Sequence, residues 1–244
     1  MELQNLIDRF VQGLEYVDAN TSFSTANART GEIYLPGVKT LTERQFIKEL
    51  VDWWKENNRS DFDPLGSIET EVPYVGIERA KCDLVLTTDG NSQNSPEWAI
   101  EVKHIALVGN NGKNNDYGVA KILSPYLKDR SLIHDINRMR KFGVARRRAV
   151  IGYCFSYDSE TCKEAKKRHP EKSLYIENIE KVLKLNDPER LEYSILPMID
   201  FAHKIFTELN LVYDLKIKPF NHAWRHPCGG RGVVFGWELK HLKS

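Results

Sequence analysis

The 244-residue sequence has few cysteines, no long apolar run and almost no net charge. Its four cysteines are scattered without a CxxC pair, so we expect neither a disulfide framework nor a cysteine-ligated zinc site. No stretch approaches the roughly 20 apolar residues of a membrane span, and residues 1–10 lack the apolar core of a signal peptide. We therefore expect a cytoplasmic protein with no membrane partner. The net charge of +1 indicates no particular partner.

Positive charge is instead concentrated locally. Residues 121–150 contain nine Lys or Arg and two acids. A basic surface on a neutral protein is a candidate site for phosphate groups. A solvated helix face followed by a basic loop gives the same composition, so both interpretations stay open.

The chain has no repeats or low-complexity tracts, which favours one domain over residues 1–244. Apolar residues recur at helical spacing in residues 3–18 and 42–57, and Thr42 with Gln45 forms a capping-box pattern. Further helices are expected at 129–142, 159–169 and 189–210, the last broken at Pro197; strands are expected at 67–75, 80–87, 97–105, 149–157, 211–217 and 233–239. This order predicts an α/β fold with a central mixed β-sheet and helices on both faces.

Three charged residues interrupt two of the apolar strands. Asp83 lies in the first, and Glu101 and Lys103 lie two residues apart in the second, so their side chains leave the sheet on one side. Buried charges need a metal, an ion pair or a wet cleft. Two carboxylates, a backbone carbonyl and waters suit Mg²⁺, which polarises phosphates. Lys103 can orient a water or stabilise developing charge. The alternative is an ion pair that holds the sheet together, although such pairs seldom improve on apolar residues.

A fourth charged residue, Glu43, begins the helix at 42–57. At 3.6 residues per turn it falls near the middle of the apolar stripe, one turn before Phe46 and Ile47. It therefore points toward the core side of the helix, where it can join the site. The helix dipole alone also favours an acid in the first turn. Three other acids compete with it for a place at the site, Glu49, Glu69 and Glu71.

Asp83, a strand–turn–strand hairpin and then Glu101-Val102-Lys103 resemble the motif of the PD-(D/E)xK nuclease superfamily. The resemblance covers about residues 42–170, with Cys82 in place of the motif's Pro. It implies a restriction-endonuclease-like core in which Asp83, Glu101 and the Val102 carbonyl bind Mg²⁺, with Mn²⁺ as a substitute. It further implies that Lys103 assists the attacking water. Many members add a glutamate from the first core helix.

That helix glutamate corresponds to Glu43, which then joins the catalytic and metal-binding residues. Residues 1–41 become an N-terminal helix and loop, and residues 171–244 a C-terminal extension for DNA recognition or dimer contacts. DNA contacts are expected from outward-facing basic residues after the motif and from the tail, where arginines and a histidine accompany a tryptophan. These residues are Arg138, Lys141, Arg146, Arg225, His226 and Arg231.

The expected function is a Mg²⁺-dependent endonuclease that hydrolyses double-stranded DNA, of the sequence-specific restriction type. One active site cuts one strand, so cutting a duplex favours a homodimer with two-fold symmetry. Two alternatives stay open. One is a nuclease of the same fold with another target, such as a DNA junction, damaged DNA or RNA. The other is a nucleic-acid-binding module that keeps a nuclease-like core without activity.

Overall fold

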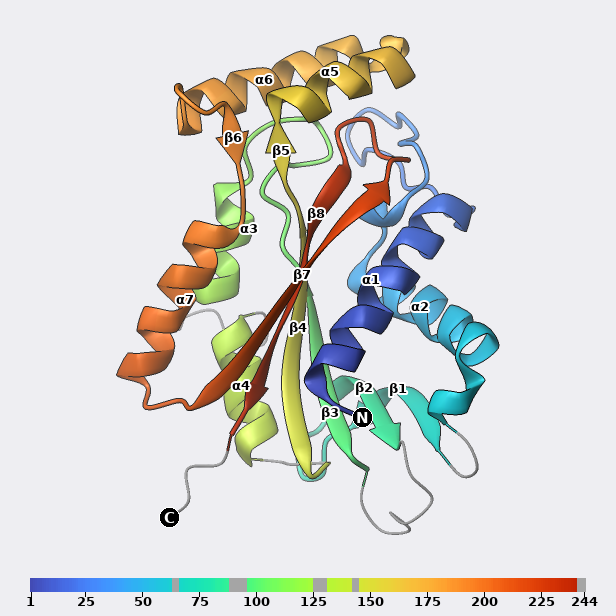
Figure 1. The fold of residues 1–244 in the computed structure, drawn as a ribbon, viewed down its shortest axis with the longest axis vertical. Coiled ribbons are helices and arrows are strands. Elements are labelled where there is room, and N and C mark those ends of the chain that lie inside the picture. The colour runs from blue at the N-terminus through green and yellow to red at the C-terminus, as the bar shows by residue number, and fades with distance from the viewer. Residues whose placement is uncertain (63–65, 88–95, 125–130, 142–144, 241–244) are drawn as a thin grey trace.

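The computed structural model describes residues 1–62, 66–87, 96–124, 131–141 and 145–240. A mixed sheet of six strands forms the centre, in the order β1-β2-β3-β4-β8-β7 (Figure 1). Its strands are β1 (Ser67–Pro73), β2 (Lys81–Thr87), β3 (Trp98–His104), β4 (Arg147–Phe155), β7 (Tyr213–Ala223) and β8 (Gly230–Leu239). Only β3 and β4 pair in parallel, and the other neighbours are antiparallel. The predicted α/β fold with a mixed sheet is confirmed.

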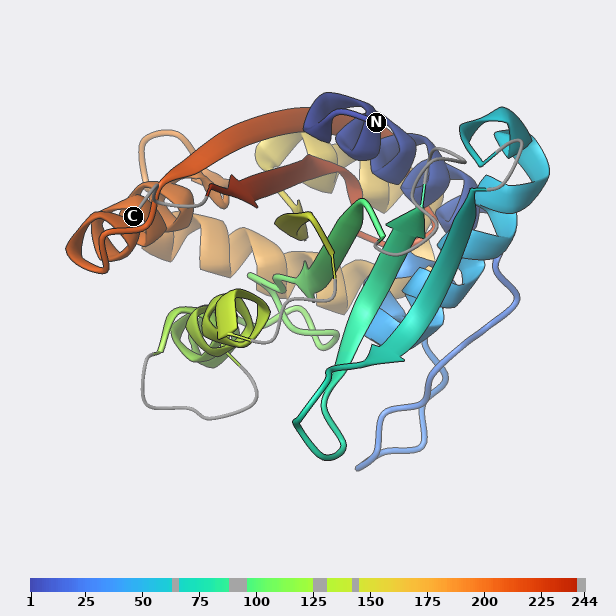
Figure 2. The same ribbon diagram turned by 90° about the horizontal axis from the view of Figure 1, so that it is seen from below.

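Seven α-helices accompany the sheet in the described ranges. They are α1 (Leu3–Asn20), α2 (Glu43–Asn57), α3 (Asp116–Leu123), α4 (Leu132–Lys141), α5 (Ser159–Arg168), α6 (Ser173–Asn186) and α7 (Leu196–Glu208). Figures 1 and 2 show α1 and α2 on one face of the sheet and α3 and α4 on the other. At one end, α5 and α6 lie over a small ladder of β5 (Tyr157–Asp158) and β6 (Glu192–Tyr193). Helices on both faces were predicted, and this is confirmed.

Several local predictions hold and two fail. The Thr42 side chain accepts a hydrogen bond from the Gln45 backbone, and the Gln45 side chain accepts one from the Thr42 N–H, as the capping-box pattern predicts. The helix expected at 189–210 instead begins at Leu196, and Pro197 lies in its first turn, where a missing N–H is harmless. Helix α6 was not predicted. The turn expected after residue 87 and the ends of the helix expected at 129–142 fall outside the described residues.

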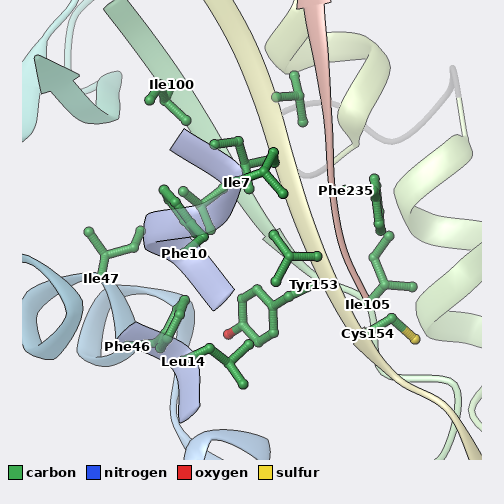
Figure 3. Close-up of a cluster of buried hydrophobic side chains, with 14 of the residues drawn as sticks. Ile7, Phe10, Leu14, Phe46, Ile47, Ile100, Ile105, Tyr153, Cys154 and Phe235 are labelled. Carbon is green, nitrogen blue, oxygen red and sulfur yellow. The ribbon is translucent and has the colours of Figure 1, made fainter. Parts of the chain in front are cut away.

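The main core lies between β3, β4 and the helices α1 and α2. Figure 3 shows Phe10 of α1, Phe46 and Ile47 of α2, Ile100 of β3 and Tyr153 of β4 in this cluster, all of them buried. The apolar residues of β3 therefore face α1 and α2. Because side chains alternate along a strand, its charged residues emerge on the opposite face, which α4 covers.

The C-terminal hairpin belongs to the same sheet, since β8 pairs with β4 and β7 pairs with β8. Helix α1 crosses this hairpin closely enough that a Cβ on Gly236 would lie 2.8 Å from the Ile7 side chain. Residues 213–239 thus complete the central layer rather than extending beyond it. None of the helices in the described part of the chain combines the length and apolar character that crossing a bilayer requires.

Candidate active site

The hairpin of β2 and β3 places Asp83 next to Glu101. Leu84 lies opposite Ile100 in this antiparallel pair, so continuing the register by one residue sets the two carboxylates side by side. Asp83 Oδ2 accepts a hydrogen bond of 2.8 Å from the N–H of Val102. The structure therefore brings together the two acids that the motif contains.

Glu101 and Lys103 leave β3 on the face toward α4, as their spacing predicts. The Glu101 residue is only 2% exposed. Its Oε1 accepts hydrogen bonds from the Tyr74 hydroxyl at 2.5 Å and from Nη2 of Arg138 at 3.0 Å. Tyr74 follows β1 directly and is itself buried. The Glu101 carboxylate is thus held from two sides.

Lys103 lies between two acids from different helices. Its Nζ is 2.9 Å from Asp135 Oδ2 on α4 and 3.7 Å from Glu43 Oε2 on α2. Glu43 Oε1 in turn accepts a hydrogen bond of 3.0 Å from the N–H of His104. The first turn of α2 therefore reaches the end of β3, and Glu43 lies where its place in the apolar stripe predicts.

Helix α4 contributes a carboxylate and a guanidinium that the sequence did not assign to the site. Asp135 is 1% exposed, and its Oδ1 accepts a hydrogen bond of 2.6 Å from Arg138 Nη2. The two residues are one turn apart, so they share the face toward β3. The sequence did hold a sign that Asp135 faces the sheet. It follows Leu132 by three residues and precedes Ile136, so it lies in the apolar stripe of the helix.

Four carboxylates and two cations make up this cluster, so full ionisation leaves an excess of two negative charges. Glu43, Asp83, Glu101 and Asp135 are the acids, and Lys103 and Arg138 are the cations. Such an excess in a largely buried region favours one of two outcomes. Either a further cation enters, or one carboxyl group keeps its proton.

The pKa shifts in the cluster follow from burial and from this charge balance. Burial raises the pKa of Glu101 well above its usual range, and Asp83 and Asp135 raise it further. Burial also raises the pKa of Glu43. Burial by itself would lower the pKa of Lys103, but Glu43 and Asp135 outweigh it and raise the pKa. The raised pKa of Lys103 favours its charged ammonium form, whereas the raised pKa of Glu101 disfavours its ionised form.

The other upstream acids lie apart from Lys103. Glu71 forms ion pairs with Arg44 at 3.1 Å and Lys81 at 3.2 Å, and Glu69 is exposed. Both line a cavity of about 570 Å³ between α2 and β1, which Asp83 also borders. Glu49 is half-buried on α2. Of the four candidate glutamates, Glu43 is the one that the structure places against Lys103.

The expected DNA-facing residues have different surroundings. Lys141 and Arg146 are exposed, near the end of α4 and the start of β4. The outward orientation expected of Arg138 is wrong, because its side chain is 17% exposed and is paired with Glu101 and Asp135. Its place on the helix face shared with Asp135 explains the difference.

The tail residues also differ from the prediction. His226, expected to contact DNA, is only 3% exposed, and its Nε2 lies 3.0 Å from the Tyr175 hydroxyl. Arg225 binds the Thr21 carbonyl through Nη1. Arg231 is partly exposed and lies 2.9 Å from Glu160. The side chains of Arg225, His226 and Arg231 thus already have partners within the protein.

No family model, no curated protein and no solved structure matches this chain.

Proposed function

We propose that this protein is a metal-dependent endonuclease of the PD-(D/E)xK type that hydrolyses phosphodiester bonds in double-stranded DNA. One observation carries the proposal: Asp83 lies beside Glu101 on paired strands, with Lys103 on the same face, in a cluster that has excess negative charge. The strand pair β2–β3, the preceding α2 and the following α4 also occur in the order that the resemblance implies.

Asp83, Glu101 and the backbone carbonyl of Val102 are the groups that would hold Mg²⁺ or Mn²⁺. Asp83 Oδ2 and Glu101 Oε1 accept the hydrogen bonds described above, so a cation on Glu101 would share that carboxylate with Tyr74 and Arg138. Within the described residues, no group of three or more His, Cys, Asp or Glu side chains is arranged to hold a metal ion. The proposed donor set is two carboxylates, a carbonyl and waters, which suits a hard cation. The bound ion would polarise the phosphate and acidify a water.

The protein side chains supply the remaining parts of hydrolysis. Asp135 and Glu43 hold the Lys103 ammonium group in one position, where it can orient the attacking water and stabilise charge that develops on the phosphate. Glu43 acts here as a positioning residue, since its carboxylate is divided between Lys103 and the His104 N–H. Water adds to phosphorus, and one ester oxygen leaves as the P–O bond breaks.

The restriction type of activity requires recognition of a sequence and two cuts. We propose a homodimer in which each subunit cuts one strand. Lys141 and Arg146 are exposed beside the end of α4, where they can contact phosphates, and such contacts give affinity without sequence information.

A second candidate is a nuclease of the same type with another target, such as a DNA junction, damaged DNA or RNA. The C-terminal turn favours it, because His226 is buried and the side chains of Arg225 and Arg231 are bound to Thr21 and Glu160. Reading bases in the major groove needs free donors at the surface. A target recognised by shape needs fewer of them.

Incubation of the purified protein with supercoiled plasmid, with Mg²⁺ or with EDTA, tests the proposal. Discrete metal-dependent fragments with one end sequence support the restriction type. Cleavage confined to branched DNA, damaged DNA or RNA in parallel reactions supports the second candidate. No metal-dependent cleavage of any of these substrates would contradict both.

A further inference from the structure

Arg138 occupies the carboxylate that the proposed metal needs. Its Nη2 lies 3.0 Å from Glu101 Oε1 and 2.6 Å from Asp135 Oδ1. The guanidinium carbon lies 5.1 Å from the centre of the Tyr74 ring. A guanidinium and a divalent cation both draw on the same carboxylate charge. Binding of one therefore weakens binding of the other.

We propose that Arg138 is a built-in counter-ion of Glu101 that a divalent cation displaces, and that Asp135 then keeps the guanidinium beside the site to bind a phosphate oxygen. This inference rests on the proposed function, and it adds a positioning residue and a phosphate ligand to that site. It assigns Arg138 an interior role in place of contact with the outer DNA backbone.

Asp135 is placed to retain the guanidinium when Glu101 releases it. Its contact with Arg138 is the shorter of the two, and charge-assisted bonds of this length are strong. Asp135 also lies 2.9 Å from Lys103, so it fixes both cations of the site relative to each other. A guanidinium freed from Glu101 would thus stay near the ammonium group that faces the reacting phosphate.

The guanidinium also carries a buried donor that no described residue satisfies. Arginine has five N–H donors, and both hydrogen bonds found here use Nη2. The Nε–H of Arg138 is buried, and among the residues that the structure describes no acceptor lies within hydrogen-bonding distance of it. A buried donor without an acceptor is costly. A phosphate oxygen that enters the site would supply the acceptor.

Calorimetric titration with Ca²⁺ and with Mg²⁺, without nucleic acid, tests the displacement. In Arg138→Gln the competing charge is gone, so we expect divalent cations to bind at least about fivefold more tightly, the lower end of usual coupling between sites. Cleavage by the same variant should fall. Arg140→Gln is the matched control, because it removes one positive charge from an exposed position of the same helix. It should change metal affinity less than twofold.

The possible results separate the two proposals. If the wild type binds metal and Arg138→Gln binds it no more tightly than Arg140→Gln does, the displacement is wrong while the nuclease proposal stands. If neither the wild type nor any variant binds a divalent cation, the nuclease proposal fails as well. Should Arg138→Gln fail to fold, as judged by its circular dichroism melt, Arg138→Lys serves in the same titration. A lysine cannot span both carboxylates as a guanidinium does, so its metal affinity should lie above that of the wild type, and an unchanged value would overturn the displacement.

Discussion

Two lysines, the largely buried Lys103 and the buried Lys39, have opposite surroundings. Lys103 lies between the carboxylates of Asp135 and Glu43, which raise its pKa. Lys39, in the 3₁₀ turn η1 (Val38–Thr40), is 3% exposed, and its Nζ donates to the neutral amide oxygen of Asn110 at 3.1 Å. Among the described residues, no carboxylate contributes to the pKa shift of Lys39. Burial lowers its pKa to about 8.

The difference lies in the charges that surround each ammonium group. Lys103 lies in a cluster of four carboxylates and two cations, and this excess of negative charge suits a divalent cation. Around Lys39 the neighbours are neutral, and burial lowers the pKa of nearby His104 to about 3, with Lys39 contributing. The carboxylates around Lys103 are those of the proposed metal site. A charge with one neutral partner indicates a stability cost.

The largest expected effect is a loss of cleavage rate when the side chain of Asp83 or Lys103 is removed. We expect Asp83→Ala and Lys103→Ala each to slow plasmid cleavage by about 10²-fold or more, as loss of one preorganised charge does in other active sites. The rate of Mg²⁺-dependent nicking measures this. Fluorescence anisotropy with labelled DNA in Ca²⁺ should show binding largely intact.

Lys81→Ala is the matched control for these variants. Lys81 begins the same strand as Asp83, but its ammonium group pairs with Glu71, and its side chain is half exposed. Its cleavage rate should stay close to that of the wild type. A wild-type rate in Asp83→Ala or Lys103→Ala would remove that residue from the site.

The second effect concerns stability. Asp135→Ala leaves Lys103 and Arg138 without the carboxylate they share, and breaking a buried ion pair from one side costs about 3 kcal/mol. Urea denaturation at pH 7 should show this loss. Asp52→Ala, at an exposed position of α2, should change the free energy of unfolding by less than about 0.5 kcal/mol. Equal free energies of unfolding of the two variants would show that the ion pairs of Asp135 with Lys103 and Arg138 do not stabilise the fold.

The third prediction is that replacing Lys39 raises the free energy of unfolding instead of lowering it. A pKa that falls from 10.5 to about 8 on folding corresponds to roughly 3 kcal/mol of cost at neutral pH. Lys39→Met removes that cost together with one hydrogen bond to Asn110, so we expect it to raise the free energy of unfolding at pH 7 by about 1–2 kcal/mol.

The pH dependence of this stability difference tests whether the lowered pKa of Lys39 causes it. Between pH 8 and about 10.4 the folded protein has lost the Lys39 proton while the unfolded chain still holds it, so this group adds stability as pH rises. The advantage of Lys39→Met over the wild type should therefore shrink from pH 7 to pH 10 in paired denaturation curves. An advantage that is constant or growing over this range would show that Lys39 titrates normally.

The smallest expected effect is at His104. Its ring stacks on Tyr153 with centroids 4.7 Å apart, and its buried Nε2 has no hydrogen-bond partner among the described residues. Phenylalanine keeps the stacking, so His104→Phe should alter the free energy of unfolding by less than about 1 kcal/mol. Cleavage should be nearly unchanged, because the backbone N–H that binds Glu43 remains. A large loss of activity would mean that the imidazole itself takes part.

The sequence allowed the hairpin of the site to be predicted because local patterns define it. Alternation along β3 separates Glu101 and Lys103 from Val102, and the apolar stripe of α2 orients Glu43. These are properties of one strand or one helix turn, so they hold whatever the rest of the chain does.

The remaining partners depend on contacts between segments far apart in the sequence. Tyr74 and Arg138 meet at Glu101 from a loop and a helix, 27 and 37 residues away in the chain. His226 is buried by contact with Tyr175, which lies on a helix that was not predicted. A basic or polar residue in a sequence carries no sign of whether a distant segment will cover it. The sequence therefore predicts an outward Arg138 and a DNA contact for His226, although both are covered.

The place of β8 in the sheet bears on how the chain acquires its structure. This strand pairs with residues 149–155 of β4, yet about 75 residues separate the two strands in the sequence (230 − 155). Until residues 230–239 emerge from the ribosome, β4 offers open backbone groups on that edge. The nascent chain therefore carries the Asp83–Glu101 hairpin before the layer that rigidifies it can form. The sheet that contains the proposed site is therefore complete only after β8 has paired with β4.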